Sequence, residues 1–262
     1  MSPSRQRGGQ GPRRLVVSAH KGGVGKTTLA VNLAAAMAET HKATTLLVDV
    51  DPQGAATAAL GLEPSGPGLY DVLMREDSVA DAIMSTDVAN LDVLPANLDL
   101  AGAEIALPRH PEWQTCLREV LLATNDHYDL VVIDSAPGLG VLPFAALVAG
   151  DQVLIAATPS YLSLRGLPHL IETVAQAKQF NPALQILGIV PSMVGRRTLH
   201  QDEVLAELEK RWPGWSLPHL PRRVAIEDAT AAGQPITSYA PTSTSATAVR
   251  LLAREVLARA SA

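Results

Sequence analysis

The sequence predicts an α/β protein with a doubly wound, mainly parallel sheet flanked by helices on both faces. First, short apolar segments of strand length alternate with longer helical patterns along most of the chain, which is typical of parallel sheets covered by helices. Second, a glycine-rich segment separates the first predicted strand from the first predicted helix. Third, two other apolar segments end in aspartates, and sheets of this class bind ligands at the carboxyl ends of their strands.

The predicted elements follow one another without an internal repeat or an interdomain linker. The strands are short apolar segments, at 14–19, 44–50, 91–94, 129–135, 152–157 and 186–191. The helices carry apolar residues at helical spacing, at 26–40, 68–75, 98–106, 112–125, 141–149, 166–180, 198–211, 225–232 and 244–259. Glycine and proline predict a loop at 62–68, and the proline-rich stretch 212–221 is expected to wrap the surface.

Length and composition fit one large domain. The chain has 262 residues, of which 47% are hydrophobic, so a substantial core can form. We expect this domain to span 14–262, after a disordered basic tail at 1–13 that contains arginines and no acidic residue. That tail either touches DNA or is solvated without a function. The single cysteine, Cys116, excludes an intramolecular disulfide.

Charge and hydropathy narrow the function classes. A formal net charge of −5 at pH 7 excludes a protein that is basic overall, so any contact with DNA requires a local patch. No apolar run reaches the ~18 residues that a membrane span requires, and no signal peptide is visible. We therefore expect a cytoplasmic protein without stable membrane association.

The glycine-rich segment is a variant phosphate-binding loop. Residues 20–28 read His-Lys-Gly-Gly-Val-Gly-Lys-Thr-Thr, whereas a conventional loop reads G-x-x-x-x-G-K-[ST]. The place of the first conventional glycine is taken by His20, and Lys21 follows it. Gly22, Gly23 and Gly25 allow the backbone to turn its N–H groups toward a polyphosphate. A chance glycine-rich turn is the alternative, but the strand before the loop and the helix after it favour phosphate binding.

Two lysines bracket these glycines. Lys26 is placed to reach the β- and γ-phosphates of a nucleotide, and the Thr27 hydroxyl is placed for Mg²⁺. One site needs only one phosphate lysine, so Lys21 predicts a charge that meets a phosphate in a facing subunit. The alternative is that Lys21 is an ordinary solvated loop lysine.

Aspartates end two further apolar segments. In Leu-Leu-Val-Asp-Val-Asp-Pro-Gln-Gly, Asp49 and Asp51 alternate at a strand end and so share one side of it. In Asp-Leu-Val-Val-Ile-Asp-Ser-Ala-Pro-Gly, four apolar residues precede Asp134, a Walker B pattern that holds Mg²⁺ directly or through water. Either aspartate motif alone could be a strand-end turn, but both follow a phosphate loop.

Together these motifs resemble the ParA/MinD ATPases, and most closely the short ParA proteins that segregate chromosomes, plasmids or other cargo. The resemblance rests on K-G-G-V-G-K-T-T, V-D-V-D-P-Q-G and the I-D-x-x-P strand, and it extends over roughly residues 14–258. Later stretches at 220–224, 233–236 and 239–241 match the ParA branch more weakly.

The resemblance implies a P-loop fold, an ATP-dependent homodimer, ATP hydrolysis with Mg²⁺, non-specific binding to nucleoid DNA, and stimulation by a ParB-like or cargo-adaptor partner. It assigns Asp51 to orienting the attacking water, and Lys21 to crossing the dimer interface. The catalytic residues it implies are Lys21, Lys26 and Asp51. The nucleotide-binding residues are Lys21, Gly22, Gly23, Val24, Gly25, Lys26, Thr27, Thr28, Pro221 and Arg222, and the magnesium residues are Thr27, Asp49 and Asp134.

For DNA, we expect a patch of Arg196, Arg197 and Arg223. Of these, Arg197 matches a family position, an arginine-threonine pair at 197–198, that contacts DNA in some members. The alternative is that Arg196 and Arg197, near a strand end, are simply solvated. This chain departs from the family at Ala225, where a basic residue is common, and at 242–245, which lacks the usual arginines. Arg165 stands where glutamate is frequent. These departures concern the DNA surface and the cargo rather than the ATP site.

Two other function classes are compatible with a phosphate loop. A MinD-like regulator of division or flagellar placement would bind membranes through an amphipathic extension after its last helix, and we expect none here, because 249–257 reads as the last core helix itself. A metabolic ligase or kinase would need a substrate pocket beside the phosphates, and it would leave Lys21 unexplained.

Overall fold

The computed structural model describes residues 12–195 and 198–261. Its sheet has the strand order β3-β4-β2-β5-β1-β6-β7. All neighbouring strands are parallel except the β3–β4 pair, which is antiparallel. The strands are β1 (Arg13–Ser18), β2 (Thr45–Val50), β3 (Met84–Ser85), β4 (Leu91–Leu94), β5 (Leu130–Ser135), β6 (Gln152–Ala157) and β7 (Gln185–Pro191).

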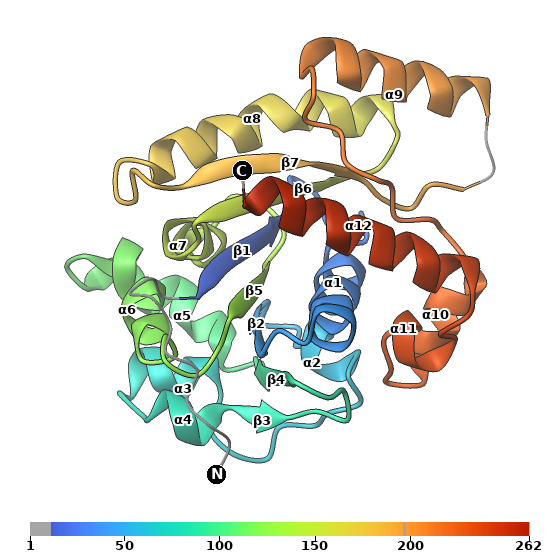
Figure 1. Cartoon of the computed structure of the whole chain (residues 1–262). Helices are drawn as coiled ribbons and strands as arrows, with labels where there is room; N and C mark the ends of the chain where they lie inside the picture. Colours follow the sequence, from blue (N-terminus) through green and yellow to red (C-terminus); the bar gives the residue numbers. More distant parts are fainter. Residues whose placement is uncertain (1–11, 196–197, 262) are drawn as a thin grey trace.

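Helices cover both faces of this sheet (Figure 1), so the predicted fold class is confirmed. One face packs against α1 (Lys26–His41), α2 (Ala55–Ala58), α10 (Val224–Ala231), α11 (Ile236–Tyr239) and α12 (Thr244–Ala260). The other face packs against α3 (Leu69–Met74), α4 (Val79–Ala82), α5 (Leu100–Ala106), α6 (Cys116–Leu122), α7 (Val141–Ala149), α8 (Tyr161–Ala177) and α9 (Leu199–Arg211).

Alternation along the strands divides the core into two layers. In β1, Leu15 and Val17 join the layer that contains α1, whereas Val16 joins the layer that contains α7. All three side chains are almost fully buried. Because successive strand residues point to opposite faces, a strand covered on both faces reads as a continuous apolar run, and this explains why the strands were recognisable in the sequence.

Helix α1 lies between the sheet and the C-terminal helices and is buried nearly all round. Alanines allow its neighbours to approach closely. Asn32 joins its beginning to the C-terminal segment: the side-chain amide donates to the Thr28 carbonyl at 2.8 Å, and the side-chain oxygen accepts from the Ile236 amide at 2.7 Å. The C-terminal part of the chain is thereby held beside the helix that begins at the phosphate loop.

The strand predictions agree with the structure to within one residue at each end. Sequence analysis missed β3, α2, α4 and α11, each at most four residues long and therefore too short for a periodic pattern. The helix predicted at 112–125 is a 3₁₀ turn at Trp113–Thr115 followed by α6. The tail predicted at 1–13 lies mainly outside the described residues, although Arg13 already begins β1.

Helix α8 begins five residues before the predicted start at 166. Its N-cap is Ser160, whose hydroxyl accepts from the Ser163 amide at 3.3 Å. The predicted helix already contains Gly166 and Pro168, and what it missed is the turn at 161–165 that precedes them. Glycine and proline usually interrupt helices, so an early turn of α8 contains residues that oppose it.

The proline-rich stretch at 212–221 runs beside β7 instead of wrapping loosely over the surface. Ile189 forms a parallel bridge with Ser216, and Val194 forms one with Pro221. The Ile189 amide donates to the Trp215 carbonyl at 2.7 Å, and Leu217 is buried. The backbone hydrogen bonds that the edge strand would otherwise leave unmade are satisfied by this segment.

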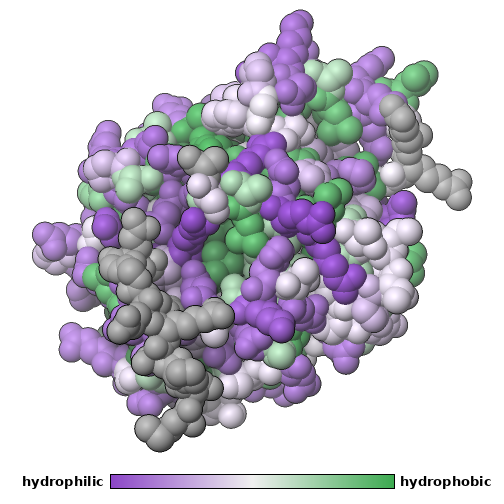
Figure 2. All heavy atoms as spheres, in the orientation of Figure 1, coloured by the Kyte–Doolittle hydropathy of each residue, from purple (hydrophilic) through white to green (hydrophobic). Residues whose placement is uncertain are grey.

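None of the helices within the described ranges is both long and apolar enough to cross a bilayer. The face shown in Figure 2 is largely hydrophilic, with hydrophobic side chains gathered in separate patches.

Candidate functional site

The phosphate loop joins the carboxyl end of β1 to the first turn of α1. Gly23 and Gly25 have φ values of 73° and 80°, in the left-handed region that glycine tolerates best. Gly25 is also the N-cap of α1, and no side chain caps this end. The first amides of a long helix are therefore left for an external acceptor, which suits an anion.

Lys26 and Asp134 form a buried ion pair behind this loop. The Lys26 ammonium lies 2.7 Å from one Asp134 oxygen, and both side chains are almost inaccessible to water. Burial raises the pKa of Asp134, while Lys26 and a hydrogen bond from Thr27 lower it. Lys26 and Thr27 of the phosphate loop therefore interact with Asp134 at the end of β5.

The second Asp134 oxygen is buried and has no hydrogen-bond partner among the described residues. A buried acceptor of this kind normally has a partner. A carboxylate oxygen beside a hydroxyl is the donor set that Mg²⁺ prefers, with water completing its shell. Asp134 and Thr27 therefore fit a magnesium ion, in agreement with the Walker B interpretation.

Asp49 is held from behind by protein groups. One of its oxygens accepts from the Thr57 amide and hydroxyl, each at 2.9 Å, and the other accepts from the Asp51 amide at 3.2 Å. Burial and the neighbouring Asp134 carboxylate raise the pKa of Asp49 to about 6, against the lowering effect of the Thr57 hydrogen bonds. Its role as a magnesium residue stays a prediction, and its contacts join the site to α2.

Asp51 faces the loop. One of its oxygens accepts from the Gln53 amide at 3.0 Å, which fixes the turn after β2. Its side chain helps to line a cavity of about 250 Å³ together with Lys21, Lys26 and Thr27. The residue predicted to orient water therefore opens onto the same space as the phosphate lysines.

A second cavity of about 250 Å³ adjoins the loop cavity. Pro221 and Arg222, predicted as nucleotide-binding residues, line it together with Ile226. Thr28 and Met193 line both cavities. This second cavity has a mostly apolar wall, which suits a nucleoside base, while the loop cavity suits its phosphates.

Lys21 lies on the loop rim. Its side chain is exposed and lines the loop cavity. Across residues 12–195 and 198–261, no ion pair holds it. The two lysines of the loop thus differ in kind, because Lys26 is buried against Asp134 whereas Lys21 faces outward.

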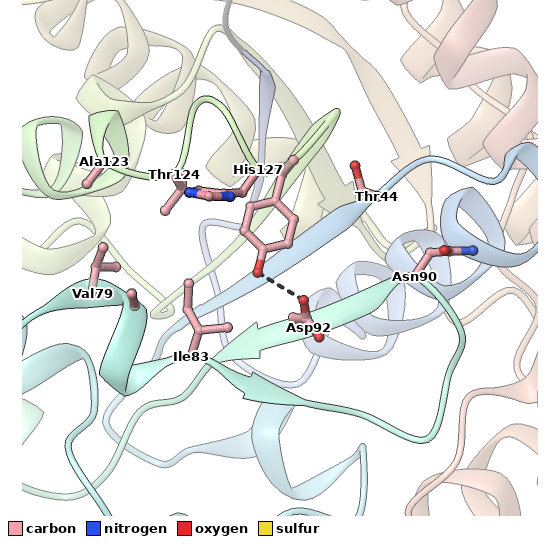
Figure 3. A pocket seen from close by; sticks show the side chains of 10 residues that line it. Thr44, Val79, Ile83, Asn90, Asp92, Ala123, Thr124 and His127 are labelled. Atoms are coloured by element: carbon pink, nitrogen blue, oxygen red, sulfur yellow. Dashed lines mark hydrogen bonds between the residues drawn. The ribbon is translucent and has the colours of Figure 1, made fainter. Parts of the chain in front are cut away.

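A larger cavity, about 420 Å³, lies away from the loop, near the amino ends of β2, β4 and β5 (Figure 3). Thr44, Asn90 and His127 line it, and the Tyr128 hydroxyl donates to Asp92 at 2.9 Å. The phosphate loop is at the opposite, carboxyl edge of the sheet. Size alone would therefore mislead a search for the nucleotide site.

Sequence analysis missed Met193 and Pro137. Both line the loop cavity, and Met193 has a left-handed φ of 56°. A Cβ on Gly25 would lie 3.3 Å from the Met193 Cγ, so this side chain closes over the loop. Pro137 follows the Asp134 strand closely enough for the motif to indicate it, whereas no local pattern marks Met193.

The residues predicted for DNA are placed unevenly. Arg196 and Arg197 lie outside the described residues. Arg223 is exposed at the N-cap of α10 and lines the second cavity beside Arg222. Sequence analysis assigned Arg222 to nucleotide binding and Arg223 to DNA binding, whereas in the structure both residues line the same cavity.

Comparisons with known proteins agree with this geometry. A family model described as "AAA domain" matches residues 13–186. The chain is 40% identical over 248 residues to the sporulation initiation inhibitor protein Soj of Bacillus subtilis, covering 93% of this chain and 98% of Soj. It is 36% identical to the chromosome partitioning protein ParA of Caulobacter vibrioides, covering 94% of each.

Solved structures share this fold, and one of the two described below contains a nucleotide. One, titled a cobyrinic acid a,c-diamide synthase from Mycobacterium smegmatis with bound ADP and magnesium, is 31% identical with a TM-score of 0.83 and covers 96% of each chain. The cell division ATPase MinD of Pyrococcus furiosus is 28% identical with a TM-score of 0.80, covering 94% of this chain and 98% of MinD.

A glycine loop between a parallel strand and a helix, backed by a buried lysine–aspartate pair, defines a P-loop nucleotide-binding protein. The second lysine of the loop and the relatives described above then identify the family within this class. The chain belongs to the ParA/MinD family of P-loop ATPases.

Proposed function

We propose that this protein is an ATPase that dimerises with ATP, binds DNA non-specifically and segregates or positions a cargo on the nucleoid. The cargo would be a plasmid, a chromosome or a protein organelle, and a ParB-like or adaptor partner would stimulate hydrolysis. The observation that carries the proposal is Lys21, an exposed lysine on the rim of a nucleotide cavity that already has a buried phosphate lysine.

Within one subunit, the residues divide the work as follows. Lys26 leaves its pair with Asp134 for the β- and γ-phosphates, and the loop amides hold the same oxygens. Asp134 and Thr27 would hold magnesium, which when bound neutralises charge on the transferring phosphoryl group. Asp51 orients the attacking water from the same cavity. The second cavity, with Pro221 and Arg222, receives the adenosine.

Exposed apolar residues support a dimer face around this site. They lie at or just before the N-termini of helices that follow strands, and the topology puts these ends at the carboxyl edge of the sheet. These residues are Leu98, Leu139, Tyr161, Leu162 and Leu199, all between 45% and 84% exposed. Exposed apolar surface beside a site is typical of an interface, and a partner seated there would face Lys21.

Replacing Lys21 with alanine should leave the fold and ATP binding intact but remove ATP-dependent dimerisation and stimulated hydrolysis. The reason is that Lys21 has no ionic partner in its own described chain, so its phosphate partner belongs to the other subunit. Light scattering with ATP and Mg²⁺ measures the dimer. The matched control is Lys178→Ala, which removes another exposed lysine, at the C-terminus of α8. Wild-type dimerisation of Lys21→Ala would make Lys21 an ordinary surface charge.

DNA binding should require ATP, ignore sequence and weaken steeply with salt. A protein of net charge −5 can bind DNA only through a local patch, and a dimer doubles that patch. Each lost phosphate contact reduces the log–log salt slope by about 1, so Arg223→Ala or Arg197→Ala in a dimer should reduce it by about 2. Gel shifts on unrelated sequences at several salt concentrations measure this.

The control for the DNA patch is Arg109→Ala. Arg109 is exposed and follows α5, whose core layer is on the other face of the sheet from α10. Its loss should not change the salt slope. If the wild-type protein with ATP fails to bind DNA at low salt, or if neither arginine variant differs from it, the patch is wrong.

The alternative is a MinD-like, membrane-associated regulator of division or flagellar placement. Its support is the likeness to MinD structures. Sedimentation with DNA and, separately, with liposomes, each with ATP, distinguishes the two classes. We expect the protein to sediment with DNA alone.

A further inference from the structure

The residue before Lys21 packs against a distant helix. A Cβ on Gly166 of α8 would lie 2.9 Å from Cγ of His20 and would clash with its Cδ2, so the imidazole lies directly against the helix backbone. The His20 ring also stacks on the His169 ring, with centroids 5.9 Å apart and an angle of 29°. The first residue of the phosphate loop therefore sits in a notch on α8.

The His20 ring is held by packing more than by hydrogen bonds. The Nδ1 atom of His20 is buried, and no partner for it lies in the part of the chain that the structure describes. A conventional phosphate loop has glycine at this place, which would leave the notch empty. Lys21 follows His20 directly, so the notch is one residue away from the lysine on the loop rim.

Helix α8 is weakened at the same point. Gly166 is a poor helix former, and Pro168 has no N–H to donate to the Leu164 carbonyl. The turn before the notch begins with Tyr161 and Leu162, whose side chains are 57% and 64% exposed. These two residues belong to the apolar set proposed above as the dimer face, so the notch lies between that face and the phosphate loop.

We propose that His20 is a positioning residue that sets the phosphate loop, and with it Lys21, against the dimer-facing start of α8. The contact between the His20 ring and Gly166 couples the position of Lys21 to the position of the start of α8. This proposal rests on the proposed ATP-dependent dimer. If His20 only fills space, its replacement will change stability and leave nucleotide-dependent behaviour alone.

A double-mutant cycle tests the contact. It compares wild type, His20→Ala, Gly166→Ala and the double variant, by thermal unfolding without nucleotide. Alanine in place of glycine ordinarily stabilises a helix, yet Gly166→Ala alone should lower Tm because its Cβ meets the ring. In the His20→Ala background, the same change should raise Tm. A rise of Tm in both backgrounds would overturn the contact.

The positioning role is tested by separating ATP binding from dimerisation. His20→Ala should bind a fluorescent ATP analogue nearly as wild type does, while its ATP-dependent dimer weakens by about tenfold, a loss of about 1.4 kcal/mol. His20→Gln, which keeps a planar group of similar reach, should restore the dimer. Wild-type dimerisation of His20→Ala, or no rescue by His20→Gln, would overturn the role.

The wild-type protein separates this proposal from the proposed function. If wild type does not dimerise with ATP, the proposed function fails, and the Tm cycle still decides whether the contact exists. In that case, ATP turnover by the monomer tests the positioning role of His20. Turnover of His20→Ala equal to that of wild type would then overturn it, whereas a loss rescued by His20→Gln would support it.

Discussion

Replacing Lys26 with alanine or glutamine is expected to abolish ATP binding. Among the residues that the structure describes, Lys26 is the only buried cation at the loop, and its ammonium lies 2.7 Å from Asp134. Removing the lysine from a buried, hydrogen-bonded contact with a charged phosphate costs about 2–5 kcal/mol of binding free energy, which is about 1.5 to 3.5 orders of magnitude in affinity. A fluorescence titration with ATP and Mg²⁺ measures the loss. Nucleotide affinity within twofold of wild type would sink the assignment.

The same substitution has a second expected effect, on the nucleotide-free protein. Asp134 is completely buried and would lose its ionic partner. Removing one member of such a pair costs about 3–5 kcal/mol of folding free energy, unless the carboxyl group takes up a proton. Urea unfolding at two pH values should show that Lys26→Ala is less destabilised at low pH. Lys178→Ala is the control, and it should behave as wild type does in both experiments.

Replacing Asp51 with alanine is expected to leave ATP binding intact, to suppress hydrolysis and so to trap a dimer. Asp51 lines the loop cavity without contacting Lys26 or Asp134 through any described hydrogen bond or ion pair. Loss of a positioned acid–base group lowers rate by about 10²–10⁴-fold. Single-turnover hydrolysis and light scattering measure the two effects. Normal turnover, or a monomer in the presence of ATP, would contradict the role.

Asp51→Asn separates the chemistry from the loop. Its side-chain oxygen can still accept from the Gln53 amide, which Asp51 does at 3.0 Å, so the turn after β2 is kept. It should therefore lose hydrolysis as Asp51→Ala does while unfolding at the wild-type temperature. If Asp51→Asn hydrolyses ATP normally, the residue serves only to shape the loop.

The central strands and the phosphate loop could be predicted because their signals are local. Strands buried on both faces read as apolar runs, and the order of glycines and lysines at 22–27 specifies the loop by itself. The alternation of Asp49 and Asp51 and the run before Asp134 indicated strand ends, and in the structure Asp49 and Asp134 are register partners on β2 and β5.

Other features depend on contacts between distant segments, which no local pattern records. Met193 closes over Gly25 from across the chain, and Thr57 takes up an oxygen of Asp49. In α8, Gly166 and Pro168 oppose a helix locally, while packing against the sheet and His20 maintains it. The sites where local preference fails are thus close to the nucleotide site, as is common for functional regions.

Mixed dimers provide the most direct test of whether Lys21 acts across a dimer interface. Lys21→Ala and Asp51→Ala proteins are each expected to hydrolyse little ATP alone. In a mixed dimer, the Lys21→Ala subunit keeps its own Asp51 and receives Lys21 from its partner, so one site is complete. We predict that mixing restores turnover above the sum of the separate proteins. If Lys21 acts within its own subunit, no site in the mixture is complete, and turnover equal to that sum would contradict the account.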